Sequence, residues 1–345
     1  MQTPWWRPDS HARRAATLKG RGAILARVRG FFAAAGFTEV ETPALAVSPG
    51  MEPHLKPFAT ELLEPGGVAR PLYLHTSPEF AMKKLLAAGE RRIWQLARVF
   101  RNGERSATHH PEFTMLEWYR AGAGWRDLVG DCEALLTAAL EAAGASQLVW
   151  GGLECDPRRP WQMLSVADAF RSHADIDLLA TAPDPEAPDL DRLVRAAERA
   201  GIATHEGDRW EDLFFRIMLE RIEPLLGHPV PTVLHDYPLS LAALARPSPA
   251  DPRVAERFEL YVAGLELANA FGELTDPDIQ AARFRRDADL KERLYGECVP
   301  IDADFLAALR HGLPESAGIA LGFDRLVMVA TGADHIEQVL WAPVG

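Results

Sequence analysis

Residues 100–119, FRNGERSATHHPEFTMLEWY, decide the fold that this sequence predicts. The stretches 91–102 and 113–121 are rich in β-branched and aromatic residues, which indicates two strands joined by a polar loop. Side chains two residues apart on a strand share a face, so Phe113, Met115, Glu117 and Tyr119 are expected on one face. Arg101 is expected on the partner strand. The hairpin therefore carries a cation at one end and a carboxylate beside a phenol at the other.

This arrangement favours a binding site with two different ends. A carboxylate and a phenol side by side accept hydrogen bonds from an ammonium group, whereas a guanidinium holds a phosphate with two parallel hydrogen bonds. We therefore expect a phosphate at Arg101 and an amine at Glu117. An amphipathic hairpin with a solvated polar face is the better explanation of the pattern when it is taken alone, because exposed charges on a sheet face are common.

A second hairpin is predicted over residues 257–274, RFELYVAGLELANAFGEL. If Ala263 and Gly264 form a two-residue turn, Glu259 and Glu266 share a face as diagonal neighbours, with Cβ atoms roughly 7–8 Å apart. Two such carboxylates can share Mg²⁺, although a solvated acidic face remains the alternative. The opposite face must be buried because it is apolar; it carries Leu260, Val262, Leu265 and Leu267.

Residues 317–332, AGIALGFDRLVMVATG, predict a strand that runs into a helix. Gly318 and Gly322 let another group approach the strand backbone closely. Arg325 falls in the first helical turn, where it opposes the helix dipole, so stability alone does not explain it. By itself this pattern has little specificity.

The β-rich segments 93–120, 232–275 and 317–323 lie far apart in sequence, with helical segments between them. This order indicates an α+β fold, an antiparallel sheet flanked by helices. Helices are expected over 15–36, ending at Gly36, over 125–144, ending at Gly144, and from the Ser77-Pro78-Glu79 start signal. Residues 151–230 are expected to be helical, rich in loops and without catalytic groups.

The composition narrows the class of protein. The 345 residues include 37 Lys and Arg against 49 Asp and Glu, a net charge of −12. An acidic chain lacks the basic footprint of a non-specific nucleic-acid binder. Three separated cysteines without a C-x-x-C pair are typical of a reducing cytoplasm. We expect no secretory signal and no membrane span, because no apolar run reaches ~18 residues.

Together, these segments resemble the class II aminoacyl-tRNA synthetases of the lysyl type. Residues 21–35 with the following GFTEVETPAL resemble motif 1, FRNGERSATHHPEFTMLEWY resembles motif 2, and GIALGFDRL resembles motif 3. The resemblance covers most of the chain and is weakest over residues 145–230. It implies one class II synthetase-like catalytic domain over residues 1–345, with 151–230 as a variable insertion and no anticodon-binding domain.

One part of the lysyl type is missing. Its tRNA synthetases carry an N-terminal oligonucleotide-binding barrel, for which the sequence leaves no room before motif 1. This matches the stand-alone relatives in the family, which ligate (R)-β-lysine to elongation factor P. Ala320 stands where lysyl-tRNA synthetases usually have glycine, and its methyl is expected to disfavour α-lysine. The resemblance thus implies (R)-β-lysine and elongation factor P as substrates, no tRNA, and a homodimer built by motif 1.

The resemblance also assigns site residues. Arg101 and Arg325 are the implied catalytic residues, facing the α- and γ-phosphates of ATP. The implied ATP-binding residues are Arg101, Asn102, Gly103, His110, Phe113, Glu266, Leu267, Gly322 and Arg325. The implied amino-acid-binding residues are Ser77, Pro78, Glu79, Glu117, Tyr119, Asn269, Glu273 and Ala320. Glu259 and Glu266 match the Mg²⁺ ligands, and Glu273 with Tyr119 would hold the side-chain ammonium.

The sequence departs from the family at the nucleotide end. Gly103 stands where the family often has a glutamate, which leaves Glu104 or the Gly103 carbonyl to contact adenine. His110 replaces an asparagine, and Thr108 stands where lysyl enzymes have an arginine. These departures make the contacts to ATP less well specified than those to the amino acid.

The implied reaction needs no enzyme nucleophile. The carboxylate of the amino acid attacks the α-phosphorus of ATP, and the adenylate then acylates a lysine amine. Positioning and charge neutralisation by Arg101, Arg325 and Mg²⁺ supply the catalysis. Two rivals remain: a truncated lysyl-tRNA synthetase paralogue using α-lysine, and a non-catalytic amino-acid sensor. The acidic charge disfavours the first, and retention of both arginines and both metal carboxylates disfavours the second.

Overall fold

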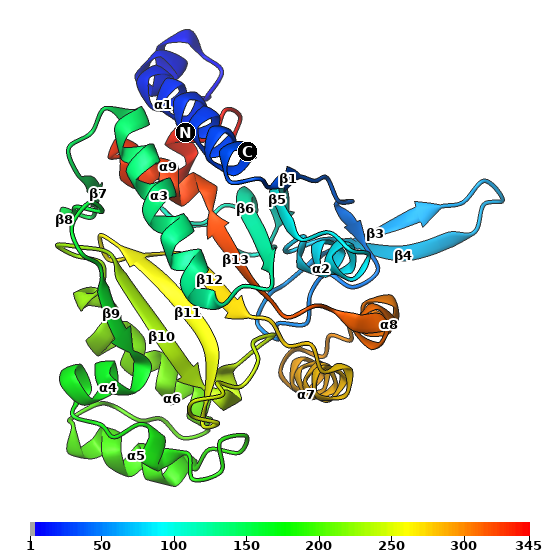
Figure 1. Cartoon of the computed structure of the whole chain (residues 1–345), viewed down its shortest axis with the longest axis vertical. Coiled ribbons are helices and arrows are strands. Elements are labelled where there is room, and N and C mark those ends of the chain that lie inside the picture. The colour runs from blue at the N-terminus through cyan, green and yellow to red at the C-terminus, as the bar shows by residue number, and fades with distance from the viewer. Residues whose placement is uncertain (1–3) are drawn as a thin grey trace.

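The computed structural model describes residues 4–345, and a sheet of eight strands runs through its centre (Figure 1). The strand order is β1-β5-β6-β13-β12-β11-β10-β9. The strands are β1 (Thr38–Glu39), β5 (Arg92–Phe100), β6 (Glu112–Ala121), β9 (Gln162–Ser165), β10 (Thr232–Pro238), β11 (Val254–Val262), β12 (Leu265–Gly272) and β13 (Ser316–Gly322). The three predicted β-rich segments therefore meet in one sheet, and the α+β class is confirmed.

The predicted antiparallel pairing is right in the centre of the sheet and wrong at both edges. All pairs from β5 to β10 are antiparallel, but β1 runs parallel to β5 and β9 parallel to β10. Long connections carrying helices separate both parallel pairs, and such crossovers permit parallel neighbours. The sheet is therefore mixed.

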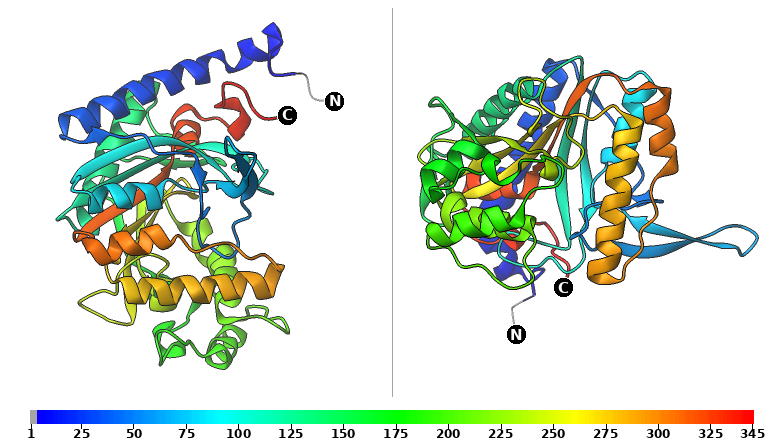
Figure 2. Two further views of the ribbon diagram at one scale, coloured as in Figure 1. Left: turned by 90° about the vertical axis from the view of Figure 1, so that its right-hand side faces the viewer. Right: turned by 90° about the horizontal axis from the view of Figure 1, so that it is seen from below.

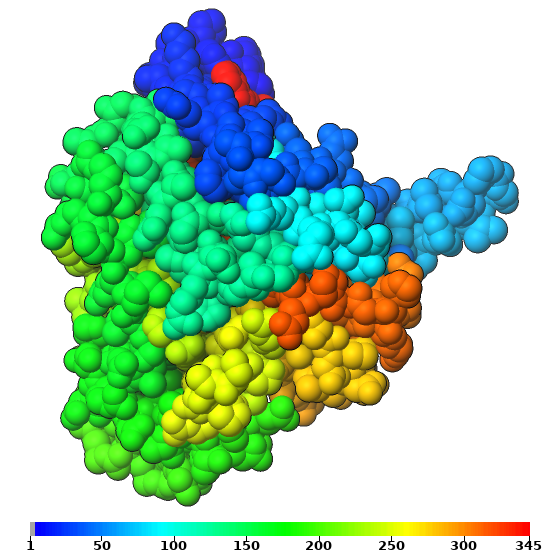
Figure 3. Space-filling model, viewed as in Figure 1, coloured from blue at the N-terminus to red at the C-terminus, as the bar shows by residue number. Residues whose placement is uncertain are grey.

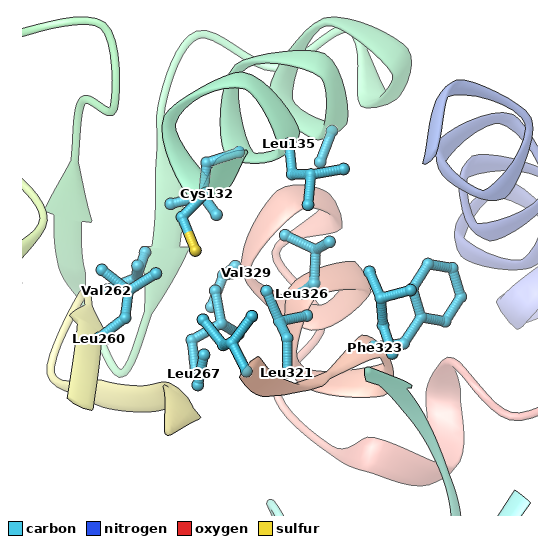
Figure 4. Close-up of a cluster of buried hydrophobic side chains, with 14 of the residues drawn as sticks. Cys132, Leu135, Leu260, Val262, Leu267, Leu321, Phe323, Leu326 and Val329 are labelled. Carbon is cyan, nitrogen blue, oxygen red and sulfur yellow. The ribbon is translucent and has the colours of Figure 1, made fainter. Parts of the chain in front are cut away.

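One face of the sheet is covered by three helices, which enclose the main core. These are α1 (Pro8–Ala34), α3 (Trp125–Ala143) and α9 (Phe323–Thr331), and Figure 2 shows α1 lying across the outside of this layer. In the core, Cys132 of α3 lies near Val262 of the sheet and Val329 of α9, and Leu135 points toward Leu326 (Figure 4). The apolar face predicted for the second hairpin is thus buried here.

The helix α1 begins earlier than predicted, at Pro8 instead of residue 15. Proline suits the first helical position because its missing N–H would be unpaired there, and Asp9 adds a favourable charge to the first turn. The expected stop is present, since Gly36 adopts a φ of 73° just beyond the helix. Phe32 of this helix is buried against the ring of Trp94, with centroids 4.7 Å apart.

The opposite face of the sheet is flanked by α2 (Glu79–Ala87), α7 (Pro277–Tyr295) and α8 (Ala303–Gly312). Beside them, β4 (Ala69–Leu74) pairs with β3 (Phe58–Leu63) on one side and with the short β2 (Leu45–Ala46) on the other. The β3–β4 hairpin projects from the body of the molecule (Figure 1, Figure 3).

Residues 151–230 are mainly helical, as predicted, but they also contribute to the sheet. The helices α4 (Val166–Ala174), α5 (Leu190–Arg199) and α6 (Trp210–Ile217) enclose a second core against Tyr237 and Tyr261. The sequence prediction missed the small β7 (Leu148–Trp150)–β8 (Leu153–Cys155) pair and the edge strand β9. The expectation of one domain with this segment as an insertion stays a prediction.

None of the helices within residues 4–345 combines the length and the apolar character that crossing a bilayer requires. The three cysteines are all free; Cys132 and Cys155 are buried, and Cys298 is exposed.

Candidate active site

A cavity of about 240 Å³ lies on the sheet face opposite the main core. The first turn of α2, the loop between β5 and β6, the strands β6, β12 and β13, and the start of α9 all contribute to its lining. Eleven of the predicted site residues line it: Ser77, Glu79, Arg101, His110, Phe113, Glu266, Leu267, Asn269, Ala320, Gly322 and Arg325. The structure therefore brings three distant sequence segments to one place.

The remaining predicted residues lie around this cavity. Pro78 lines a neighbouring cavity of about 630 Å³, which shares Ser77 and Glu79 with the first. Glu117, Tyr119, Glu259 and Glu273 are buried at or below 8% exposure and do not line the cavity. Asn102 and Gly103 do not line it either. The Asn102 backbone instead pairs with Lys56, and Gly103 sits in an exposed turn.

Arg101 and Arg325 form one end of the cavity, which we call the cationic end. Arg101 lies just beyond the end of β5, not on it, and its guanidinium carbon is 5.2 Å from the centre of the Phe113 ring. Arg325 donates hydrogen bonds to the carbonyl of Glu266, at 2.7 Å, and to Nε2 of His109, at 2.9 Å. The motif 2 loop and the second hairpin thus hold Arg325 in place.

His110 is bound on both ring nitrogens by the chain itself. Its Nδ1 donates to the carbonyl of Glu112 at 2.6 Å, and its Nε2 accepts from the N–H of Val344 at 3.2 Å. His110 therefore has no free nitrogen to offer a nucleotide, and it ties the motif 2 loop to the C-terminal residues.

The opposite end of the cavity is acidic. Glu52, Glu79, Glu117 and Glu273 gather there, and we call them the acidic end. Cross-strand pairing positions the residues at this end of the sheet. Asn269, Ala320 and Glu117 are direct neighbours in one row across β12, β13 and β6. The next row is Phe271, Gly318 and Tyr119.

Gly318 is needed because of a close approach. A Cβ atom at this position would overlap with the Tyr119 ring and with the carboxylate of Glu273. The predicted role of the strand glycine, which was to let another group approach the backbone, is confirmed here. By contrast, a Cβ at Gly322 would meet only the Arg325 side chain, at 3.5 Å or more, so the cavity beside it is open.

Lys83 is a residue of the site that sequence reasoning missed. Its Nζ lies 2.5 Å from a carboxylate oxygen of Glu79 and 2.5 Å from one of Glu273, and its side chain is 1% exposed. Beside it, Glu117 accepts hydrogen bonds from the Tyr119 hydroxyl at 2.5 Å and from Ser77 Oγ at 2.8 Å. The i,i+4 spacing of Glu79 and Lys83 on α2 was the one available signal.

Burial raises the pKa of two carboxylates at the acidic end. It raises the pKa of Glu117 to about 8, with a further contribution from the charge of Glu79. Burial likewise raises the pKa of Glu273 to about 7, against the attraction of Lys83. Lys83 thus faces three of these carboxylates, Glu79, Glu117 and Glu273, and a bound cation would favour their ionised forms.

The buried polar atoms that lack a hydrogen-bond partner are acceptors at one end of the cavity and a donor at the other. Within residues 4–345, Glu52 Oε2, Asn269 Oδ1 and Glu273 Oε1 are buried acceptors without a hydrogen-bond donor. At the cationic end the unpartnered buried atom is a donor, Arg101 Nε. Buried polar groups are normally paired, so this pattern calls for a ligand with N–H donors at one end and anionic oxygens at the other.

Glu259 and Glu266 lie on the second hairpin as predicted. Ala263 and Gly264 form the two-residue turn, with φ values of 50° and 77°, and Tyr261 pairs with Glu266. Sequence reasoning missed a register shift between Leu260 and Tyr261. This bulge places Asn269 opposite Glu259, so that Glu266 and Asn269 both line the cavity, although strict alternation would separate them.

The two carboxylates suit a hard cation. Burial and the charge of Glu259 raise the pKa of Glu266 to about 7, and a cation would relieve this repulsion. Glu259 accepts hydrogen bonds from Arg257, at 2.7 Å, and from Tyr261, at 2.9 Å. Within residues 4–345, no three or more His, Cys, Asp or Glu side chains form a metal cluster, so ligand oxygens would have to complete the coordination.

Known proteins match this chain along almost its whole length. The family described as tRNA synthetases class II (D, K and N) matches residues 8–344. A protein of Haemophilus ducreyi is 40% identical over 97% of this chain and 95% of its own length. Proteins of Yersinia enterocolitica and Vibrio cholerae are each 41% identical, over 100% and 94% of this chain and 99% and 94% of their own lengths. All three are named elongation factor P--(R)-beta-lysine ligase, and the chain belongs to the class II tRNA synthetases, within the group that carries this name.

Proposed function

We propose that this protein is a ligase that activates (R)-β-lysine with ATP and Mg²⁺ and transfers it to a lysine of elongation factor P. The observation that carries the proposal is the polarity of the cavity, with unpartnered acceptors at the acidic end and arginines at the cationic end. The names of the relatives supply the two substrates. The proposed compartment is the cytoplasm, where the three free thiols would stay reduced.

The first step joins the amino acid to AMP. With its ammonium groups at the acidic end, the substrate directs its carboxylate toward the cationic end. A carboxylate oxygen then attacks the α-phosphorus, and the bond to pyrophosphate breaks. Arg101 and Arg325 stabilise the charge that develops on the phosphates. Glu259 and Glu266 would hold Mg²⁺, which when bound neutralises phosphate charge and orients the leaving group.

The second step transfers the amino acid to the acceptor. The lysine amine attacks the adenylate carbonyl, a C–N bond forms, and AMP leaves as the C–O bond breaks. The amine must also lose a proton. Both oxygens of Glu117 already accept hydrogen bonds, from Tyr119 and Ser77, so the departing phosphate is the better-placed acceptor.

Intact-protein mass spectrometry tests the acceptor. Elongation factor P incubated with this enzyme, ATP, Mg²⁺ and (R)-β-lysine is expected to gain one β-lysyl increment. Replacement of its acceptor lysine is expected to abolish the gain. A parallel reaction contains bulk tRNA and L-α-lysine. Charged tRNA with unmodified elongation factor P would instead show a lysyl-tRNA synthetase paralogue, and no product with any amino acid would indicate a non-catalytic sensor.

Ala320 is expected to set the choice between the two lysines. Ala320 lines the cavity, and on β13 it is paired with Asn269 of β12 on one side and with Glu117 of β6 on the other. A methyl group in a fitted pocket typically changes discrimination by about 1–3 kcal/mol, roughly 10–200-fold. Ala320→Gly should therefore raise kcat/KM for L-α-lysine relative to (R)-β-lysine in ATP–pyrophosphate exchange. An unchanged ratio would remove Ala320 as a selectivity residue.

We also propose that the protein is a homodimer. Leu45 and Val47, which follow the motif 1 strand, are 46% and 57% exposed. An apolar surface next to motif 1 favours burial against a second copy. Light scattering at micromolar concentration is expected to give twice the chain mass of 38.0 kDa. A monomer under these conditions would refute the dimer and leave the assignment of the reaction unaffected.

A further inference from the structure

We propose that Glu52 binds the second ammonium group of the amino acid, the one on C3 of (R)-β-lysine, and so acts as a specificity residue. The inference rests on the proposed function and adds a residue outside the three class II motifs. Glu52 lies in the loop between β2 and β3, and nothing in the sequence pattern singled it out.

Glu52 is placed where a small ligand would meet it. It lines the 240 Å³ cavity together with Ser77 and Glu79, and it also lines the 630 Å³ cavity and a third cavity of about 380 Å³. It is therefore the carboxylate at which the three spaces meet. Its Oε2 atom is buried and has no hydrogen-bond partner within residues 4–345.

The loop that carries Glu52 is held on both sides. The carbonyl of Pro49 accepts from the backbone N–H of Thr76, at 3.1 Å, and from its Oγ1, at 2.6 Å. On the other side, Lys291 donates to the carbonyl of Leu55 at 2.5 Å. The carboxylate is also closely packed, because a Cβ at Gly50 would lie 2.6 Å from Glu52 Oε2. The side chain is thus presented to the cavity by a fixed backbone.

The other carboxylates of the acidic end already have partners. Glu79 and Glu273 share Lys83, and Glu117 is hydrogen-bonded to Tyr119 and Ser77. Glu52 accepts a hydrogen bond from its own backbone N–H, but among residues 4–345 its Oε2 has no such contact. Burial raises its pKa, and the nearby charge of Glu79 adds to the shift, whereas Arg101 and Lys291 oppose it. Lys291 is engaged with the Pro53 and Leu55 carbonyls, so it does not reach the Glu52 carboxylate as a hydrogen-bond donor.

A diammonium substrate resolves this imbalance. An unpaired buried carboxylate is costly, and an ammonium with three N–H donors can satisfy Glu52 and Glu79 together. The terminal ammonium would remain with Glu273 and Tyr119. Moving the first amine by one carbon, from C3 to C2, shifts it toward the cationic end and away from Glu52. The carboxylate of Glu52 therefore favours the β-amino acid over its α-isomer.

The test combines one variant with three substrates in ATP–pyrophosphate exchange. Glu52→Gln is assayed with (R)-β-lysine, with L-α-lysine and with 6-aminohexanoic acid, which keeps the chain and terminal amine but lacks the C3 amine. We expect kcat/KM for (R)-β-lysine to fall about 30-fold or more. The value for L-α-lysine should fall less, and that for 6-aminohexanoic acid should change less than about twofold, because it has no group for Glu52 to bind.

Control variants distinguish the role of Glu52 from the ligase activity on which it depends. Glu41→Gln removes a carboxylate that lines the 630 Å³ cavity alone, and it should leave all three values unchanged. Melting temperature and KM for ATP are measured for each variant, and Glu52→Asp, which keeps the charge, should retain an intermediate preference. Equal losses with all three substrates would overturn the role of Glu52. A wild-type enzyme without exchange activity toward any of them would overturn the proposed function itself.

Discussion

Glu273→Gln is expected to lower kcat/KM for (R)-β-lysine in ATP–pyrophosphate exchange by about 30-fold to several thousandfold. Truncating or neutralising one partner of a desolvated, charge-assisted contact costs about 2–5 kcal/mol. Glu273 is 1% exposed, and its Oε1 has no donor within residues 4–345. A glutamine keeps the shape but carries no charge, and its amide nitrogen would oppose an ammonium.

Lys83 makes this experiment a test of stability as well. Without the charge of Glu273, the buried ammonium keeps only Glu79, so some loss of folding stability is expected. KM for ATP is therefore measured with the melting temperature, and a folded variant with normal ATP binding would locate the defect at the amino acid. Glu256→Gln is the matched control because Glu256 is ion-paired with Arg246 outside the cavity. Near-normal exchange by Glu273→Gln with an unchanged melting temperature would place the ammonium site elsewhere.

The features predicted correctly from sequence are those set by local geometry. Strand alternation assigned Met115 and Tyr119 to one face of β6, and they lie away from the main core, which holds the alternate residues Leu116 and Trp118. The Ala263-Gly264 turn fixed the register that pairs Tyr261 with Glu266. Each of these inferences needs only a strand period of two or a two-residue turn.

The features that sequence reasoning missed depend on contacts between distant segments. The bulge that brings Asn269 to the cavity interrupts alternation on β12 at Leu267, without glycine or proline at that position. Glu52 belongs to no motif, and only the packing of its loop against Thr76 and Lys291 places it at the site. The sequence around Lys83 is that of an ordinary helix lysine. Its partner Glu273 follows 190 residues later in the chain. No local pattern encodes such pairings.

Asp324→Ala is expected to lower the free energy of unfolding by about 3–5 kcal/mol. Asp324 is 1% exposed, and its carboxylate accepts from Arg21 Nη1 at 2.5 Å and from the backbone N–H of Thr114 at 2.6 Å. Arg21 also donates to Thr114 Oγ1 at 3.0 Å. Removing one member of a buried ion pair leaves the other charge uncompensated, which produces a loss of this size. Urea unfolding followed by circular dichroism measures it.

The same hydrogen-bond network joins the three class II motifs. The Asp324→Ala substitution should therefore also weaken ATP binding at the cationic end. Arg21 lies on α1, Thr114 on β6 beside Phe113, and Asp324 on α9 beside Arg325. Loosening Asp324 is therefore expected to raise KM for ATP more than KM for the amino acid. Asp304→Ala is the control, because Asp304 pairs with Lys84 at 2.9 Å but is 83% exposed, and exposed pairs contribute about 0–1 kcal/mol. An Asp324→Ala loss as small as that of the control would show that the three motifs are held together by the main core alone.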